Sequence, residues 1–213
     1  MPEQTIEYCS LHYLNQWITK DHKFCIILSN GNKEEKIQAL KEAGNFYGIA
    51  RNLPLKYDVK KGIQRYKPVL DIIDNVNLDY FKENPIKKII EIEGKISKQY
   101  GDRGVLSLTT KFLWLKIQHP VIIYDSQAKN ALGLKTALYE SYYEKWLCEF
   151  LKRENEIKEK CEELAKIHKY AITYQKNTKI DIGKNAKKYI KKISSEKWFH
   201  ERVFDIYLWH KGK

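Results

Sequence analysis

Apolar residues recur at helical spacing along most of the chain, and no stretch keeps the strict alternation of a half-buried strand. This pattern predicts helices over residues 4–18, 33–52, 60–76, 85–100, 105–118, 126–132, 139–168, 183–193 and 195–209. The apolar run 23–28 fits either a helix or an extended segment, and 139–168 is long enough for one helix or two. The periodicity therefore predicts an all-α fold.

Local signals set several of the predicted boundaries. Asn84 and Pro85 are typical of a helix start, and Leu53-Pro54 of a helix end. Pro68 lies inside a helical pattern and predicts a kink or a split there. Ser194 or Ser195 is the expected cap of the last helix.

The chain shows no internal repeat, linker or low-complexity tract. Its 213 residues suffice for one domain with a sizeable core. We expect a single domain, 1–213, of two helical lobes packed as one compact unit. The lobes are 1–100 and 135–213, around a central segment, 101–134.

Several classes of protein are disfavoured by composition. No run of about 18 apolar residues occurs, and the N-terminus lacks a signal-peptide pattern, so we expect a cytoplasmic monomer without a membrane partner. The four cysteines are scattered without a C-x-x-C pair and away from the histidines. They are therefore expected to be free thiols, with no metal site and no organic cofactor.

Positive charge is concentrated at the C-terminal end. Lys and Arg number 39 against 27 acidic residues, and 176–213 alone holds 11 Lys and Arg against four Asp and Glu, a net charge of +7. Such a region favours a polyanion such as nucleic acid, although a solvated basic surface has the same composition. The residues that would contact phosphates are Lys184, Lys187, Lys188, Lys191 and Lys192.

The candidate chemistry centres on Lys111, which lies in the first half of the almost wholly apolar helix 105–118. Apolar surroundings and a helix N-terminus both disfavour an ammonium ion, so a lysine there is suited to act as a neutral amine nucleophile. The structural alternative is that Lys111 extends past Thr109 and Thr110 to water.

Asp125 follows Lys111 by 14 residues, after the apolar run Val121–Tyr124 and before the short helix closed by Gly133. Aspartate is a preferred N-cap, and a cap fixes the direction of its carboxylate. We expect the segment 121–124 to return along the lysine helix and bring Asp125 beside the turn that contains Lys111.

The segment from Thr110-Lys111 through His119-Pro120 to Tyr124-Asp125 resembles the active site of helix-hairpin-helix DNA glycosylases, most closely their small 8-oxoguanine-glycosylase-like branch. Trp198-Phe199, Arg202–Asp205 and Leu208-Trp209 resemble the end of that branch. The resemblance implies that Lys111 attacks the sugar C1′ and that Asp125 assists base departure. The Leu-Pro-Gly-x-Gly turn that precedes the family's lysine is replaced here by Gly101–Leu108.

Other candidates have ordinary structural alternatives. Arg51 and Asn52 could reach a DNA strand or the gap left by an extruded base, or could cap a helix. Tyr142, Tyr143 and Trp146 could stack on a flipped base, or could belong to the core, since they recur at helical spacing.

The sequence thus predicts an enzyme that excises a damaged or modified base from double-stranded DNA, with strand nicking as an optional second step. The resemblance implies 8-oxoguanine as the base, and a phage-modified base such as glucosylated hydroxymethylcytosine is the alternative. The competing hypothesis is a non-catalytic DNA-binding module. A buried Lys111 adjacent to Asp125 would favour the enzyme, and a Lys111 directed to solvent would favour the module.

Overall fold

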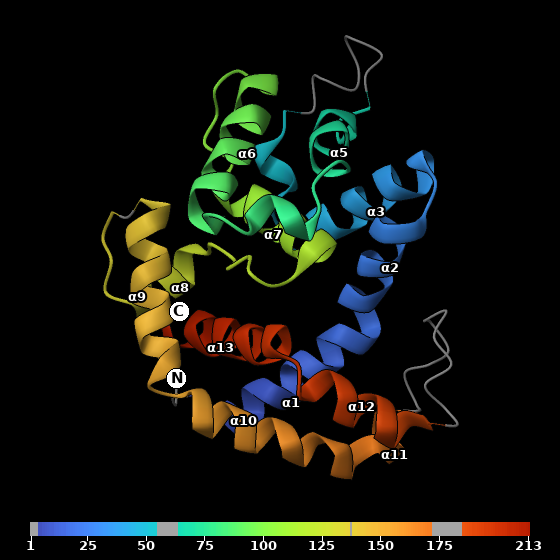
Figure 1. Cartoon of the computed structure of the whole chain (residues 1–213), viewed down its shortest axis with the longest axis vertical. Coiled ribbons are helices and arrows are strands. Elements are labelled where there is room, and N and C mark those ends of the chain that lie inside the picture. Colours follow the sequence, from blue (N-terminus) through green and yellow to red (C-terminus); the bar gives the residue numbers. More distant parts are fainter. Residues whose placement is uncertain (1–3, 55–63, 137, 172–184) are drawn as a thin grey trace. The chain divides into compact units, whose positions relative to one another are not determined.

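The computed structural model describes residues 4–54, 64–136, 138–171 and 185–213, and Figure 1 shows its helices. The chain divides into two compact units. Unit 1 combines Met1–Lys23 with Asp125–Lys213, and unit 2 is Phe24–Tyr124. Unit 2 therefore contains residues 101–124 of the central segment that the sequence predicts between two lobes.

The prediction of an all-α fold is confirmed, since the residues described form helices and no strand. The run 23–28 is helical, and the pattern over 139–168 forms more than one helix. None of the helices described combines the length and the apolar character that crossing a membrane requires.

Unit 1 is organised around its last helix, α13 (Lys197–Lys211), which packs against α1, α8, α10 and α12. The other elements of the unit are α1 (Ile6–Gln16), the π-helical turn η1 (Trp17–Asp21), α8 (Ser126–Ala131), α9 (Tyr139–Leu151), α10 (Glu154–Glu163), η4 (Leu164–Ile167), α11 (His168–Ala171) and α12 (Ala186–Ser194). Just beyond α13, a Cβ at Gly212 would collide with the Gln127 backbone of α8. The absence of a side chain at Gly212 thus permits the close approach of α8.

A buried polar cluster ties α9 to α13. The Asp205 carboxylate accepts hydrogen bonds from Trp146 Nε1 at 2.8 Å and from the Arg202 guanidinium at 2.9 Å. Arg202 also lies over the Tyr13 ring of α1, 5.4 Å from its centroid. Burial raises the pKa of the Asp205 carboxyl to about 6, against the opposing effects of Arg202 and Trp146. Paired and hydrogen-bonded in this way, the buried charges are compensated.

Unit 2 packs α7 (Leu106–Ile117) against α5 (Lys67–Ile73) and α6 (Pro85–Gln99). Its remaining elements are α3 (Lys33–Phe46), η2 (Ala50–Asn52) and η3 (Leu78–Phe81), and α2 (His22–Asn30) contains the passage from unit 1. Helix α7 is buried almost continuously from Leu108 to Leu115, as expected for a helix that is apolar all round.

A tight turn joins α6 to α7. Gly101 and Asp102 both have left-handed backbone conformations, with φ of 77° and 57°. The Glu93 carboxylate of α6 accepts a hydrogen bond from the Val105 N–H at 2.9 Å and so fixes the start of α7. Residues 101–104 are exposed. The chain therefore passes from α6 to α7 through a tight turn here, without the Leu-Pro-Gly-x-Gly sequence.

Three predicted helix boundaries are wrong. The helix predicted to reach Asn52 ends at Phe46, because Gly48 adopts φ 66° and the Ile49 N–H returns to the Gly44 carbonyl, a Schellman ending. The helix predicted over 60–76 spans Lys67–Ile73, so Pro68 stands in its first turn, where the missing N–H costs no hydrogen bond. A kink at Pro68 is therefore wrong, whereas the non-helical residues 64–66 agree with the alternative of a split. Residues 60–63 of this predicted helix lie outside the part described.

The third boundary is the start of α13. Its N-cap is Glu196, without a side-chain cap bond, and not Ser194 or Ser195. The hydroxyls of both serines instead donate back to the carbonyls of Lys191 and Lys192 in α12. By contrast, the cap at Asn84 is confirmed, since its side chain accepts from the Lys87 N–H at 2.9 Å.

Replacing Asp205 tests the importance of the buried cluster. Asp205→Asn should lower the free energy of unfolding by about 3 kcal/mol, because it removes the charge that pairs with the buried Arg202 guanidinium. Urea denaturation followed by circular dichroism measures the change. Glu162→Gln, an exposed charge removal in α10 of the same unit, should stay within about 0.5 kcal/mol of wild type. Equal stability of the two variants would contradict this role of Asp205.

Candidate functional site

Lys111 is buried in α7, with 6% of the residue exposed. Its ammonium nitrogen Nζ donates to Ser107 Oγ at 2.9 Å, one helical turn earlier. The next residues along the helix, Phe112 and Leu113, are fully buried. The alternative in which Lys111 extends to open solvent therefore does not hold, and the side chain is held within the protein.

The second lysine of the helix, Lys116, has a different environment. Its Nζ donates to the Leu28 carbonyl at 3.1 Å and pairs with Asp74 at 3.3 Å, where Lys36 also binds. Burial alone would raise the pKa of the Asp74 carboxyl, but the hydrogen bonds and charges of the two lysines together hold it below its usual value. Lys116 thus serves as a structural tie between elements of unit 2.

The return of the chain along α7 is confirmed within unit 2. Val121, Ile122 and Ile123 are buried, and the Tyr124 N–H donates to Thr110 Oγ1 at 3.0 Å. The same hydroxyl donates to the Leu106 carbonyl at 3.0 Å. The side chain of the residue before Lys111 therefore binds the backbone of the residue before Asp125.

Asp125 begins the second segment of unit 1 and is the N-cap of α8, as predicted. Its Oδ1 accepts a hydrogen bond from the Gln127 N–H at 2.9 Å. The backbone at Asp125 is extended, with φ −136° and ψ 141°, as a cap requires. Gly133, with φ 73°, follows the end of the short helix, which confirms the predicted stop.

The buried hydroxyl of Tyr142 is hydrogen-bonded to the Asp125 backbone. Burial, with the negative charges of Asp205 and Asp125 nearby, raises the pKa of this phenol well above its ordinary value. Tyr142 thus connects the cap of α8 to the polar cluster of unit 1. Because Lys111 belongs to unit 2 and Asp125 to unit 1, the proximity of the two side chains stays a prediction.

The proposed stacking roles of Tyr142 and Trp146 need correction. Both rings are fully buried, and Trp146 stacks on Phe150 with centroids 5.1 Å apart. Neither ring offers an open face to a base in this conformation, so the core alternative describes them. Tyr143 is only half-buried, packs edge-on against Tyr139, and remains a candidate for stacking.

Arg51 and Asn52 lie in η2, beyond the Schellman ending of α3, so the helix-cap alternative is wrong. The guanidinium of Arg65 donates to the carbonyls of Ala50 and Leu53 and holds this turn. Arg51 is exposed and Asn52 is half-buried. A contact of these two residues with DNA remains a prediction.

The basic residues of α12 form one exposed face. Lys187, Lys188, Lys191 and Lys192 are exposed, while Ala186, Ile190 and Ile193 are buried. No ion pair joins these four lysines to a residue within the described ranges. Lys184 lies outside the described residues. The four remaining lysines make up what we call the α12 basic face.

Metal-ligand clusters of three or more His, Cys, Asp or Glu side chains do not occur among the residues described. The four cysteines are free thiols, and burial raises the pKa of Cys9 and of Cys161 to about 12. His22 stacks on Trp17 and contacts the Tyr189 hydroxyl, and burial lowers its pKa to about 4. Cys9, Cys161 and His22 are therefore interpreted as structural residues.

Sequence reasoning missed the supporting hydroxyls. Ser107 lies four residues before Lys111, on the same helical face, and this spacing could have identified it. Thr110 and Tyr142 gave no comparable signal, since their partners are 14 and 17 residues away in the chain.

Comparison of the chain with protein-family models, with curated proteins and with solved structures gives no match.

The Thr110–Tyr124 bond can be removed without changing the size of the side chain. Thr110→Val should lower the free energy of unfolding by about 1–3 kcal/mol, because the Tyr124 N–H loses its acceptor. Thr110→Ser keeps the hydroxyl and should be less destabilised. Chemical denaturation compares the two variants. A valine variant as stable as the serine variant would show that this bond does not hold the return segment.

Proposed function

We propose that this protein is a DNA glycosylase, acting as a cytoplasmic monomer, that excises a damaged or modified base from double-stranded DNA. The observation that carries the proposal is the burial of the Lys111 amine in α7, with Ser107 as a hydrogen-bond partner. A lysine amine held inside the protein is a common nucleophile in amine-based covalent catalysis.

In the proposed reaction the target nucleotide is flipped out of the duplex. The lone pair of Lys111 Nζ forms a bond to C1′, and the C1′–N bond to the base breaks, with its electron pair leaving on the base. The departing base takes up a proton. The attached nitrogen then loses a proton to Asp125, and its lone pair forms the C1′=N bond as the C1′–O4′ bond breaks and O4′ takes up a proton. The product is a protonated Schiff base, from which β-elimination would nick the strand.

Asp125 is assigned two tasks that its cap position allows. Its Oδ1 is oriented by the Gln127 N–H, which fixes the direction of the carboxylate. A fixed carboxylate can stabilise positive charge that develops on the sugar and can carry the proton that the amine loses. The Thr110–Tyr124 bond supports this assignment, since it fixes the chain one residue before both Lys111 and Asp125.

The α12 basic face supports a polyanionic substrate. Four exposed lysines on one helix, without carboxylate partners in the described residues, can contact successive phosphates. Arg51 is exposed in unit 2 and is a further candidate for contact with DNA. The base itself stays open between 8-oxoguanine and a phage-modified base such as glucosylated hydroxymethylcytosine.

The alternative function is a DNA-binding module without catalysis. The α12 basic face would serve that function equally well. The buried position of Lys111 favours the enzyme, because a module has no need to take an amine out of water.

Lys111→Gln should abolish base excision, because the amide cannot attack C1′. DNA binding and thermal stability should stay close to wild type. Excision is measured as alkali-labile sites in a panel of duplexes with modified bases. The matched control is Lys116→Gln in the same helix, which should keep excision but lose stability with its ties to Leu28 and Asp74. Excision by Lys111→Gln at the wild-type rate would rule out this nucleophile.

Two substitutions at Asp125 separate chemistry from structure. Asp125→Asn should slow excision at least about 10²-fold while costing little stability, because Asn is nearly as good an N-cap as Asp. Asp125→Ala should lose the activity and also about 1 kcal/mol of stability. Excision rates and thermal melts are measured for both. An active Asn variant beside an impaired Ala variant would leave Asp125 as a cap only.

Neutralising the α12 basic face, by changing Lys187, Lys188, Lys191 and Lys192 to Gln, should weaken binding to all DNA sequences alike. The slope of log affinity against log salt concentration is negative, and its magnitude should decrease by up to about 0.9 for each phosphate that the variant no longer binds. Fluorescence anisotropy over a salt series measures it. The control neutralises four exposed lysines that already have carboxylate partners, Lys33, Lys82, Lys152 and Lys166. An equal change in slope for both variants would show that α12 is not the DNA interface.

A further inference from the structure

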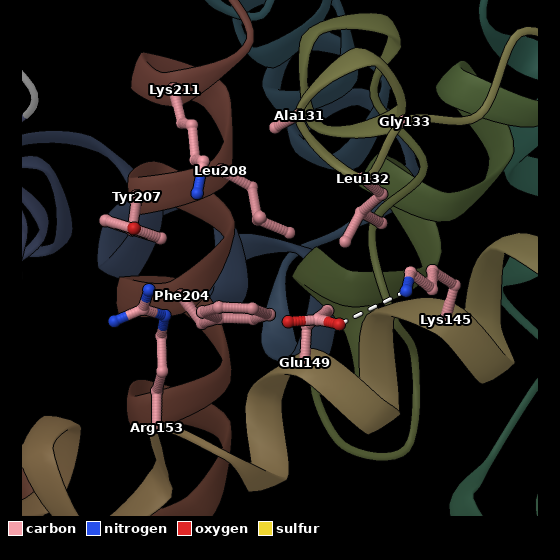
Figure 2. A pocket seen from close by; sticks show the side chains of 10 residues that line it. All are labelled: Ala131, Leu132, Gly133, Lys145, Glu149, Arg153, Phe204, Tyr207, Leu208 and Lys211. Carbon is pink, nitrogen blue, oxygen red and sulfur yellow. Dashed lines mark ion pairs between the residues drawn. The ribbon is translucent and has the colours of Figure 1, made fainter.

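Aromatic rings and basic residues meet at two places in unit 1, and at the first the charges are already paired. This place is a pocket of about 290 Å³ beside α8, α9 and α13 (Figure 2). Lys145 pairs there with Glu149 at 3.2 Å, and Arg153 pairs with Glu156 at 3.4 Å. The Arg153 guanidinium also lies over the Tyr207 ring. Internal contacts therefore account for these charges without a ligand.

The second place is a cluster of four aromatic rings that we call the η1 aromatic cluster: Trp17, His22, Tyr189 and Trp198, all in unit 1. Trp17 is at its centre and is only 4% exposed. The Trp17 ring stacks on His22 with centroids 4.9 Å apart and packs on Trp198 with centroids 4.5 Å apart. Its Nε1 donates to the Tyr189 hydroxyl at 2.8 Å. The cluster therefore joins α12 and the start of α13 to η1.

A π-helical turn brings the first two rings of the cluster together. In an α-helix, residues five apart point about 140° away from each other, so the rings of Trp17 and His22 would not face each other. The turn η1 instead closes with the His22 N–H donating to the Trp17 carbonyl, and the two rings stack. Such turns are rare and occur frequently at functional sites. The backbone thus departs from the α-helix at the residues that build the cluster.

Lysines border the half-buried rings of the cluster. Lys192 follows Tyr189 by three residues and Lys188 by four, and residues at these spacings are neighbours on a helix surface. Lys197, in the first turn of α13, directly precedes Trp198. All three lysines are exposed, and no ion pair joins them to a carboxylate in the part of the chain described. Tyr189 and Trp198 are therefore flanked by cations on two helices.

Cations beside aromatic rings suit a single strand of nucleic acid. The cations follow the phosphates, and the rings stack on unpaired bases, whereas a paired base keeps its faces on its neighbours in the duplex. On the basis of the proposed binding of DNA by the α12 basic face, we propose that the η1 aromatic cluster binds single-stranded DNA. Phosphates lie on Lys188 and Lys192, and an unpaired base stacks on Trp198.

Other partners fit this surface less well. Duplex DNA would contact the lysines and leave the rings unused. An acidic peptide would supply carboxylates without a regular series of flat rings, and a neutral aromatic ligand would leave the lysines unused. A single strand presents a phosphate and a base at every nucleotide.

Fluorescence anisotropy of the full-length protein tests the site with two labelled single strands of equal length at moderate salt. One is an oligothymidine, and the other is an abasic strand with the same phosphates. We expect the oligothymidine to bind at least about tenfold more tightly, because only this strand can stack on Trp198. Equal affinity for the two strands would overturn the stacking site and leave phosphate binding by α12 standing. Failure of both strands to bind would overturn the site together with the α12 interface.

Tryptophan fluorescence of the wild-type protein gives a second measurement that depends on no variant. The oligothymidine should quench this fluorescence at saturation, and the abasic strand should not. Quenching that is equal for the two strands, or absent for both, would overturn the proposal.

Substitutions at Trp198 assign the stacking contact. Trp198→Leu should remove the preference for the oligothymidine, whereas Trp198→Phe keeps an aromatic ring and should retain most of it. The matched control is Tyr8→Leu, at an exposed ring of α1 outside the cluster, which should keep the full preference. Circular dichroism shows whether each variant is folded. A folded Trp198→Leu with the wild-type preference would contradict the assignment.

The lysines and the excision chemistry are tested separately. Lys188→Gln and Lys192→Gln should weaken binding of both strands alike, because these changes remove contacts with phosphates only. A loss confined to the oligothymidine would contradict this placement of the phosphates. Lys111→Gln should bind both strands like wild type. Failure of excision therefore leaves the single-strand site standing, and loss of the preference leaves the glycosylase proposal standing.

Discussion

The hydrogen bond between the Tyr124 N–H and the Thr110 hydroxyl fixes the residue at which the chain leaves unit 2. Helix α7 is buried almost continuously, so the chain that leaves it must return over an apolar surface. The buried residues Val121–Ile123 provide that return, and Thr110 then ends it at a defined residue. Because Thr110 precedes Lys111 and Tyr124 precedes Asp125, one hydroxyl fixes the backbone beside both candidate catalytic residues.

The two lysines of α7 show how the same side chain serves structure and chemistry. Lys116 satisfies its charge with a backbone carbonyl and with Asp74, which Lys36 shares. Lys111 is buried, and its Nζ donates to the Ser107 hydroxyl. Withdrawing an amine from water costs free energy, and such costs are found most often at functional sites. The burial of Lys111 supports the assignment of the chemistry to this lysine.

Local signals in the sequence predicted the elements around Lys111 well. Asn84 and Asp125 cap α6 and α8 as expected, because an N-cap acts on backbone N–H groups only two or three residues away. The same kind of reasoning failed at Ser194 and Ser195, whose hydroxyls bond backwards into α12. A side chain that can bond in either direction along the chain leaves a helix start ambiguous.

Long-range contacts were beyond such reasoning. The buried ring N–H of Trp146 donates to Asp205, 59 residues later, and nothing in the local pattern around Trp146 indicates that partner. The Arg153 guanidinium likewise lies over the ring of Tyr207, a contact that depends on the packing of α13 within unit 1. The partners of residues that act through tertiary contacts could therefore be identified only from the structure.

Covalent trapping decides whether Lys111 is the nucleophile. Wild-type protein is incubated with duplexes that carry 8-oxoguanine or glucosylated hydroxymethylcytosine in the presence of borohydride, and the adduct is digested and mapped by mass spectrometry. We expect a single DNA adduct, on the peptide that contains Lys111. An adduct on another lysine, or base excision without any adduct, would contradict the assignment.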